Sequence, residues 1–175
     1  LIWFHGASVG EILSIIPLIE KLEKNKKINQ ILITSNTLSS SKILLNFRLK
    51  KTIHQFFPID TNYHTQKFLN YWKPSNAIFI DSEIWPNMIT NIKRKPISLI
   101  LINARITDKS FKKWKIFSSY AKTVFQKFDL CLSSSLKSKG YLKILGAKKI
   151  KYIGNLKFTE SEKFADDLTN NLRKF

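Results

Sequence analysis

Short apolar runs alternate with longer amphipathic segments along the chain, and this alternation limits the possible folds more than any other feature. Strands that are apolar throughout and alternate with helices are typical of a parallel sheet covered on both faces. The expected strands are Leu1–His5, Gln30–Thr34, Thr52–Phe57, Ala77–Ile80, Ser98–Asn103, Leu130–Ser133 and Ile150–Ile153. The expected helices are Glu11–Glu23, Ser39–Leu49, Thr65–Trp72, Trp85–Ile92, Phe111–Phe128 and Leu136–Leu145. The pattern predicts an α/β protein with a doubly wound, Rossmann-like parallel sheet.

Length and composition are those of one globular domain. The chain has 175 residues, of which 43% are hydrophobic and 13% aromatic, so it can bury a continuous core. It opens inside an apolar run, Leu1–Phe4, without an initiator Met, and it ends at Asn170–Phe175 without a closing element. We therefore expect a piece of a longer protein.

The charge balance predicts an anionic partner. Thirty basic residues against 12 acidic ones give a formal net charge of +18. Nucleic acid, an anionic membrane and a phosphorylated substrate would each suit such a surplus, although the abundance of Lys, Ile and Asn can also reflect an A+T-rich genome. The apolar run Ile97–Ala104 is too short to span a bilayer. The single cysteine, Cys131, excludes an internal disulfide and is expected to be a buried strand thiol, which suits a reducing compartment.

Polar turns follow the expected strands at their carboxyl ends. In a parallel sheet these ends share one edge, which is where ligands bind in this class of fold. The convergence of these turns is the strongest sign of a site that does not depend on any family. The turns are Gly6–Glu11, Thr34–Thr37, Asp81–Asn87, Asn103–Arg105 and Gly154–Lys157.

The first turn, Ser8-Val9-Gly10-Glu11, has two interpretations. As a capping box, Ser8 caps the helix and Glu11 reaches back to the Ser8 amide. As a site, Glu11 is a general base at the mouth of the first strand. The neighbouring glycines, Gly10 among them, would then let backbone amides approach an anionic ligand at the helix N-terminus.

The third turn, Asp81–Asn87, also has two interpretations. Pro86 is suited to the first turn of a helix, and acids just before it can simply stabilise the helix dipole. Alternatively, Glu83 beside Trp85 resembles a sugar-binding arrangement, in which apolar surroundings would raise the pKa of a carboxyl group.

Other polar residues carry weaker signals. Arg105 could face the same cleft or be an exposed turn residue, and Lys157 is one of many lysines. His5 lies in an apolar run and is expected in the core or at the cleft edge. The histidines and Cys131 show no metal-ligand spacing, and neither a G-x-G-x-x-G nor a Walker A pattern occurs, so no metal, cofactor or complete nucleotide site is expected.

The segment 108–128 interleaves lysines with aromatic residues. A basic amphipathic helix of this kind can lie on an anionic bilayer. It can equally pack its aromatic residues on the sheet and keep its lysines in water.

Four motifs together resemble the Kdo (3-deoxy-D-manno-octulosonic acid) transferases in order and spacing. They are His5-Gly6-Ala7-Ser8-Val9-Gly10-Glu11, Ser82-Glu83-Ile84-Trp85-Pro86-Asn87, Asn103-Ala104-Arg105 and Gly154-Asn155-Leu156-Lys157-Phe158. The similarity extends to about Phe158. The family pattern usually has Ala where this chain has Gly6 and Leu where it has Ile84, and neither departure touches a proposed catalytic group.

The resemblance implies one half of a GT-B fold, in which two Rossmann-like domains face each other across a cleft. Residues 1–155 would form the N-terminal, acceptor-binding domain, and residues 156–175 would begin the interdomain connection. The C-terminal domain, which binds CMP-Kdo, and the short membrane anchor typical of the family would lie outside this chain, so this chain alone is expected to be inactive.

The resemblance also implies residue roles and partners. Glu11 matches the family's proton acceptor, and Glu83 and Lys157 match positions assigned to transition-state stabilisation; Ser8, Gly10 and Arg105 are expected to bind substrate. The implied reaction is an inverting, metal-free transfer of Kdo from CMP-Kdo to the lipid A precursor lipid IVA. The implied location is the cytoplasmic face of the bacterial inner membrane, with an anionic membrane surface and no nucleic acid as partner.

Two other functions stay open at this point. Another GT-B enzyme, such as a nucleotide-sugar epimerase, would share the fold. A basic RNA- or membrane-binding module would explain the charge but not the acids at two strand ends. A continuous basic groove would favour the module, whereas a cleft that contains Glu11 and Glu83 would favour the transferase.

Overall fold

The computed structural model describes residues 1–155 and shows one seven-stranded sheet in which every pair of neighbouring strands is parallel. The strand order is β3-β2-β1-β4-β5-β6-β7. The strands are β1 (Ile2–His5), β2 (Ile31–Ser35), β3 (Thr52–Phe56), β4 (Asn76–Ile80), β5 (Ser98–Ala104), β6 (Leu130–Ser133) and β7 (Ile150–Tyr152). The predicted doubly wound, Rossmann-like sheet is confirmed, and each of the seven expected strands is present.

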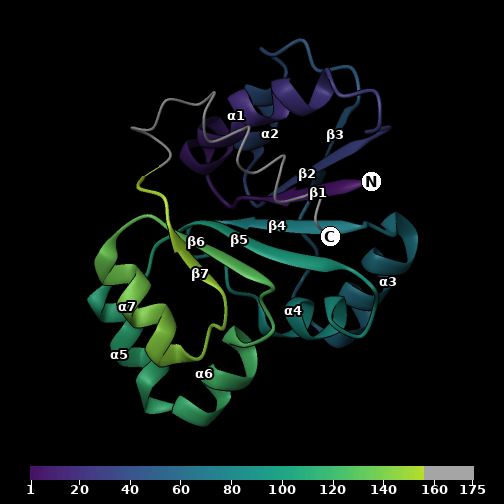
Figure 1. The fold of residues 1–175 in the computed structure, drawn as a ribbon. Helices are drawn as coiled ribbons and strands as arrows, with labels where there is room; N and C mark the ends of the chain where they lie inside the picture. The colour runs from purple at the N-terminus through teal and green to yellow at the C-terminus, as the bar shows by residue number, and fades with distance from the viewer. Residues whose placement is uncertain (156–175) are drawn as a thin grey trace.

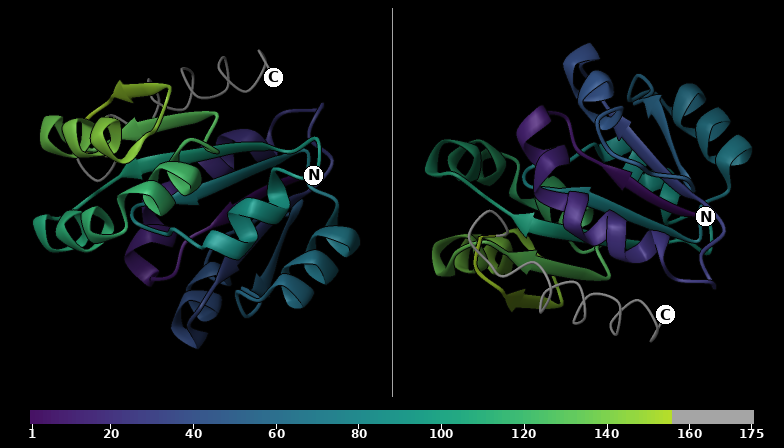
Figure 2. Two further views of the ribbon diagram at one scale, coloured as in Figure 1. Left: turned by 90° about the horizontal axis from the view of Figure 1, so that it is seen from below. Right: turned by 90° about the horizontal axis from the view of Figure 1, so that it is seen from above.

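Helices cover both faces of the sheet (Figure 1). They are α1 (Val9–Glu23), α2 (Leu38–Leu44), α3 (Asn62–Trp72), α4 (Pro86–Ile92), α5 (Asp108–Ile116), α6 (Ser118–Phe125) and α7 (Leu136–Leu145). The views from below and above show α3 to α7 on one side of the sheet and α1 with α2 on the other (Figure 2).

Two of the expected helices differ from the structure. The segment 111–128 is two helices, because Phe117 (φ −109°, ψ 54°) leaves the helical conformation, ending α5 and preceding α6. The turn lets Trp114 meet Phe125 edge to face at 5.2 Å between ring centroids. The helix expected at 39–49 ends at Leu44, and a turn at residues 45–46 follows it.

The side chains of alternate strand residues form a separate core on each side of the sheet. On one side, α1 packs its buried isoleucines and leucines over β1, β2 and the inner strands. On the other, Trp3 and Phe79 join residues of α3, α4, α6 and α7. The edge strands β3 and β7 are the exceptions to the expectation of fully apolar strands, because three of the five residues of β3 and two of the three residues of β7 are exposed. Cys131 lies buried in β6 as expected, and burial raises the pKa of its thiol to about 12.

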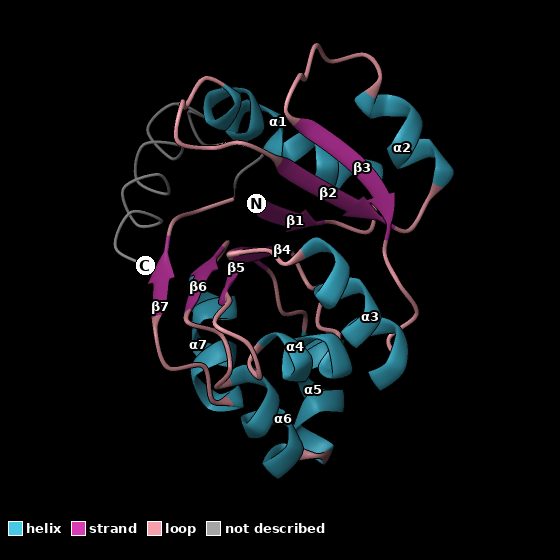
Figure 3. Ribbon diagram, turned by 90° about the vertical axis from the view of Figure 1, so that its right-hand side faces the viewer, coloured by secondary structure: helices cyan, strands magenta, loops and turns pink. Residues whose placement is uncertain are grey.

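The direction of strand addition reverses between β1 and β4. From β1 the chain adds β2 and β3 on one side, and it then crosses back to add β4 to β7 on the other. Figure 3 shows the sheet between the two groups of helices, with α1 and α2 on one side and α3 to α7 on the other. Such a reversal opens a crevice at the carboxyl ends of the strands, where ligands bind in this class of fold. Among residues 1–155, no helix is long and apolar enough to cross a membrane.

Candidate functional site

Glu11 and Glu83 flank the point where the strand order reverses. Glu11 lies in the first turn of α1, directly after β1, and Glu83 lies in the loop after β4. Since β1 and β4 are paired and parallel, both carboxylates lie at the same edge of the sheet. The expectation that they share this edge, with Gly10 in the first turn of a helix, is confirmed.

Glu11 is held by the start of its own helix. Ser8 is the N-cap residue: its side-chain oxygen accepts from the Glu11 amide at 3.3 Å. The carboxylate accepts from the Ala7 amide at 2.7 Å and from the Ser8 hydroxyl at 3.0 Å. The expected capping box is therefore modified, since Glu11 reaches the amide of Ala7 and not that of Ser8. A carboxylate has about four lone-pair sites, so these two bonds leave capacity for a further donor.

The pKa of Glu11 is raised above its usual 4.5. Burial is the main cause, and the negative charges of Glu83 and Asp81 add to it, while the hydrogen bonds from Ala7 and Ser8 act in the opposite direction. The charge of Glu83 is therefore close enough to affect the pKa of Glu11. A raised carboxyl pKa suits a group that must accept a proton during a reaction.

Glu83 is held by residues distant in sequence. His5 Nε2 lies 3.2 Å from Glu83 Oε2, and the Trp85 indole N–H donates to the same oxygen at 2.8 Å. The Glu83 side chain is only 14% exposed. Its carboxylate is therefore bound between β1 and the start of α4, and this arrangement contradicts the interpretation of Glu83 as a simple helix-dipole stabiliser.

The acid that stabilises the start of α4 is Asp60, which the sequence did not reveal. Its carboxylate accepts from the amides of Asn87 (3.2 Å) and Met88 (2.7 Å), and the Asn87 side chain donates to the Asp60 carbonyl at 2.7 Å. Pro86 occupies the first helical position, where its missing N–H costs nothing. The Trp-Pro-Asn motif thus joins the loop after β3 to the loop after β4.

Aromatic rings line the side of the site next to β3. Phe57 stacks on His5 at 3.9 Å between ring centroids and lies 5.1 Å from Trp85. Phe79 meets the His5 ring edge to face at 5.3 Å. The expectation that His5 is a core or cleft-edge residue is confirmed, because its ring is fully buried below Glu83. Phe57 is the last residue of the third strand expected from the sequence, so its position at this edge of the sheet could have been inferred.

Two residues at the strand ends adopt left-handed backbone conformations. Asp81 (φ 60°) follows β4, and Asn103 (φ 52°) lies where the register between β5 and β6 shifts. Asp and Asn tolerate this conformation better than most residues. The turn at Asp81 redirects the chain so that Glu83 returns toward β1. Backbone conformations of this kind are concentrated at functional sites.

The other residues predicted for the site differ in how exposed they are, and one of them is not described by the structure. Ser8 is exposed beside Glu11, and Gly10 is half-buried in α1. Arg105 follows β5, the next strand after β4; its side chain is exposed and its amide donates to the Asp81 carbonyl at 3.2 Å. Lys157 lies outside the described residues. Among residues 1–155, no three His, Cys, Asp or Glu residues come together as a metal site.

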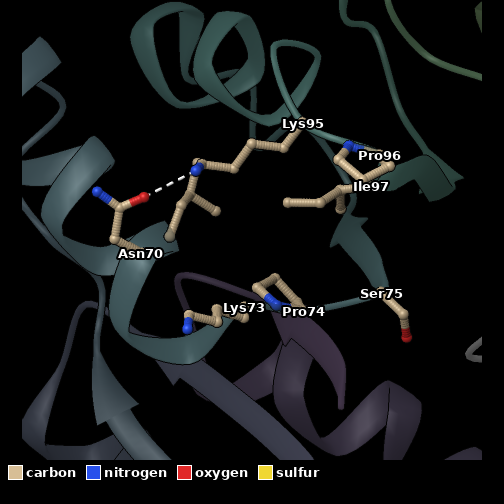
Figure 4. Close-up of a pocket in the computed structure, with 8 residues that line it drawn as sticks. Asn70, Lys73, Pro74, Ser75, Lys95, Pro96 and Ile97 are labelled. Carbon is tan, nitrogen blue, oxygen red and sulfur yellow. Dashed lines mark hydrogen bonds between the residues drawn. The ribbon is translucent and has the colours of Figure 1, made fainter.

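Two surface depressions lie away from Glu11 and Glu83. One, of about 630 Å³, is formed by the loops that enter β4 and β5, at the opposite edge of the sheet. There the Lys95 amine donates to the Asn70 side chain at 2.7 Å above an apolar floor that includes Pro74 and Ile97 (Figure 4). The other, of about 560 Å³, lies between β3 and α3.

The basic aromatic segment 108–128 packs some of its aromatic side chains on the core and leaves others exposed. Phe111 and Trp114 pack against the core, yet α5 contains no fully buried residue. At the bend between α5 and α6, the side chains of Ile116, Phe117 and Tyr120 are 74%, 67% and 53% exposed. The lysines around them are exposed as well: Lys109, Lys112, Lys113, Lys115 and Lys122.

Comparison with known proteins identifies one family. The sequence profile of the 3-deoxy-D-manno-octulosonic-acid transferases (kdotransferase) matches residues 1–160. A 3-deoxy-D-manno-octulosonic acid transferase of Rickettsia felis is 40% identical, over 93% of this chain and 35% of its own length. A probable mitochondrial 3-deoxy-D-manno-octulosonic acid transferase of Arabidopsis thaliana is 35% identical, over 90% of this chain and 36% of its own length. The chain thus spans about a third of the length of these relatives.

Solved structures confirm the fold. A putative UDP-N-acetylglucosamine 2-epimerase from Listeria monocytogenes superposes with a TM-score of 0.63 at 14% identity, over 88% of this chain and 45% of the epimerase. At this identity the similarity establishes the Rossmann-like architecture alone.

Proposed function

Because the chain belongs to the 3-deoxy-D-manno-octulosonic-acid transferase family, we propose that it is the acceptor-binding, N-terminal domain of an inverting glycosyltransferase. The reaction is the transfer of Kdo from CMP-Kdo to a lipid A precursor, lipid IVA. The observation that supports this most directly is the convergence of Glu11 and Glu83 at the β1–β4 crevice. In the proposed arrangement, residues 1–155 form this domain, residues 156–175 begin the connection, and a second domain binds the donor.

Glu11 acts as the proton acceptor. In an inverting transfer the acceptor hydroxyl oxygen bonds to the anomeric carbon while the bond from that carbon to the CMP phosphate breaks, and the hydroxyl proton must go to a base. Glu11 has spare lone pairs, a raised pKa and a place at the helix start beside the half-buried Gly10. Ser8 donates to Glu11, so it orients the base as well as capping the helix.

Glu83 and Lys157 stabilise the transition state. The departing CMP and the Kdo carboxylate are anionic, so a cation such as Lys157 offsets their charge, and the carboxylate of Glu83 balances positive charge that develops on the sugar. Arg105, exposed at the neighbouring strand end, is available to bind an anionic group of a substrate. The reaction requires neither a metal ion nor a cofactor.

The protein works at the cytoplasmic face of the bacterial inner membrane, which it reaches through a segment outside this chain. The exposed apolar residues Ile116, Phe117 and Tyr120, surrounded by lysines, support contact with an anionic lipid surface and not with nucleic acid. Thr107, the N-cap residue of α5, comes two residues after Arg105, so this helix leads from the candidate site to the exposed bend.

Transfer of Kdo from CMP-Kdo to lipid IVA by the intact protein tests the function. We expect transfer by the intact protein, and none by the folded 175-residue chain, because that chain would lack the donor pocket. A folded, intact protein without transfer would contradict the proposal. Turnover by the 175-residue chain would show that the donor site has been misplaced.

Sedimentation with lipid vesicles tests the membrane contact separately. The folded 175-residue chain should bind vesicles that contain phosphatidylglycerol and bind phosphatidylcholine alone weakly. Replacing Ile116 and Phe117 by Ser should reduce binding several-fold. Replacing the equally exposed Leu45 and Tyr71 by Ser is the matched control and should not. Equal losses in both variants, or displacement by RNA, would contradict the contact.

A further inference from the structure

We propose that His5 is a positioning residue that holds Glu83 through its Nε2–H. In this proposal the Thr34 hydroxyl, which accepts from Trp3, donates to Nδ1 of His5 and so keeps the ring proton on Nε2. The inference rests on the proposed function, because it assigns the way in which one of the proposed active-site carboxylates is oriented. It is carried by a chain of hydrogen bonds that joins three neighbouring strands.

The chain begins with Trp3, whose indole N–H donates to Thr34 Oγ1 at 2.8 Å. Trp3 and His5 are two residues apart on β1 and therefore lie on the same face of the sheet. Thr34 lies directly opposite His5 on β2. Its hydroxyl is consequently within reach of both rings, and it lies 3.0 Å from His5 Nδ1.

The direction of donation follows from the donors available. An indole N–H can only donate, so Thr34 Oγ1 is the acceptor from Trp3 and keeps its own proton to donate. Two acceptors are near that proton: His5 Nδ1 at 3.0 Å and the Phe4 carbonyl at 3.4 Å. The shorter contact is to the ring nitrogen. When Nδ1 of a neutral imidazole accepts, the ring proton is on Nε2.

Glu83 accepts the hydrogen bond from the Nε2–H group of His5. His5 Nε2 lies 3.2 Å from Glu83 Oε2, and a bare Nε2 would instead place two lone pairs against each other. The Trp85 indole donates to the same oxygen at 2.8 Å. Both donors therefore use the same carboxylate oxygen, Oε2.

The ring has little freedom to turn. His5 is fully buried, Phe57 stacks on it at 3.9 Å and Phe79 closes it edge to face. In this same ring orientation the other tautomer would donate its Nδ1–H toward the Thr34 carbonyl, at 3.3 Å, and would lose the donor to Glu83. Packing thus fixes the ring orientation, and the hydrogen bonds to Thr34 and Glu83 favour the tautomer with its proton on Nε2.

Two substitutions of His5 separate positioning from packing. In His5→Gln the side-chain amide can place N–H groups near the position of Nε2, whereas in His5→Asn the shorter amide reaches only the Nδ1 side. In the intact protein we expect kcat for Kdo transfer to fall roughly 10- to 100-fold in His5→Asn, the loss of one hydrogen bond to a charged group. His5→Gln should recover most of it, with KM for the acceptor little changed in either variant. Equal losses in both variants, or near-normal kcat in His5→Asn, would overturn the proposal.

A direct measurement of the ring proton does not depend on transfer. The intact protein is labelled with ¹⁵N-histidine, and the signals that disappear in His5→Asn identify His5. We expect a protonated Nε2 and a bare Nδ1, and replacing Thr34 by Val should remove this preference while Thr34→Ser retains it. A proton on Nδ1 in the unmodified protein would overturn the proposal. If the proposed function failed, transfer would be absent in the unmodified protein and the ring spectrum would still decide the position of the proton.

Discussion

Glu11 and Glu83 lie at the same edge of the sheet, yet they are held in different ways. The hydrogen bonds of Glu11 come from Ala7 and Ser8, four and three residues away. Glu83 depends on His5, which is 78 residues away, and on Trp85, whose helix is capped by Asp60 from another loop. The first carboxylate is positioned by local helix geometry and the second by the assembled sheet.

This difference predicts how the orientation of each carboxylate responds to substitutions elsewhere in the protein. A residue held by its own helix end keeps its orientation as long as the helix forms, since the cap is made within one turn. A residue held across strands loses its orientation when any distant partner is removed. The following substitutions test the comparison, from the largest expected effect to the smallest.

Glu11→Gln should give the largest fall in turnover. The amide cannot accept the acceptor's proton, and loss of a general base commonly lowers the rate roughly 10²–10⁴-fold. Gln is accepted at this position of a capping box, so the free energy of unfolding should change by less than about 1 kcal/mol. Steady-state kinetics and a thermal melt of the intact protein measure the two effects. The control is Glu20→Gln, the same change at an exposed position of α1. Near-normal turnover in Glu11→Gln would leave capping as the role of Glu11 and move the search for the base to Glu83.

Glu83→Gln should lower turnover by roughly 10²-fold, the scale of losing one electrostatic contribution to the transition state. It should also change the pH dependence. Burial is the main cause of the raised pKa of Glu11, and the charge of Glu83 adds to it. Turnover needs ionised Glu11, so it falls as pH drops through that pKa. Removing the charge of Glu83 lowers the pKa and should move the acid limb of the pH–rate profile to lower pH. An unmoved limb would show that the two carboxylates do not interact during turnover.

Asp60→Ala should affect stability more than chemistry. The substitution leaves the Asn87 and Met88 amides at the start of α4 without their acceptor, at a cost of about 1–2 kcal/mol. Turnover should fall modestly, because Trp85 precedes this helix and donates to Glu83. Asp60→Asn is the matched control: it keeps one acceptor oxygen and should lose about half as much stability in chemical denaturation. Equal stability of the Ala variant and the unmodified protein would exclude Asp60 as the cap.

Gly6→Ala should have the smallest effect. An added Cβ would lie 3.0 Å from Ile80 Cδ1 and 3.2 Å from Glu11 Cβ, and the first of these is the end of a flexible side chain. Ala is also the usual residue of the family pattern at this position. We expect a loss of about 1 kcal/mol or less in a thermal melt. Gly140→Ala in α7 meets no atom within 4 Å and should instead stabilise by about 0.5–1 kcal/mol. A larger loss in Gly6→Ala would indicate that the backbone of Glu11 cannot adjust.

The sequence by itself determined the fold class, the seven strands and the Ser8 cap at the start of α1. Apolar strand runs, helix periodicity and the Ser8–Glu11 cap all depend on residues that are close together in the sequence. The sequence pattern did not separate α5 from α6, because the helical periodicity continues through Phe117 and only packing on the core reveals the bend.

Only the tertiary structure decided what surrounds Glu83. Its partners depend on strand order: β1 becomes the neighbour of β4 only after the chain crosses the sheet, and this brings His5 beneath the loop that contains Glu83. The role of Asp60 is equally invisible in sequence, because an acid can cap a helix from a separate loop. Local hydrogen bonds follow from residue spacing, whereas hydrogen bonds between distant segments follow from which strands become neighbours in the sheet.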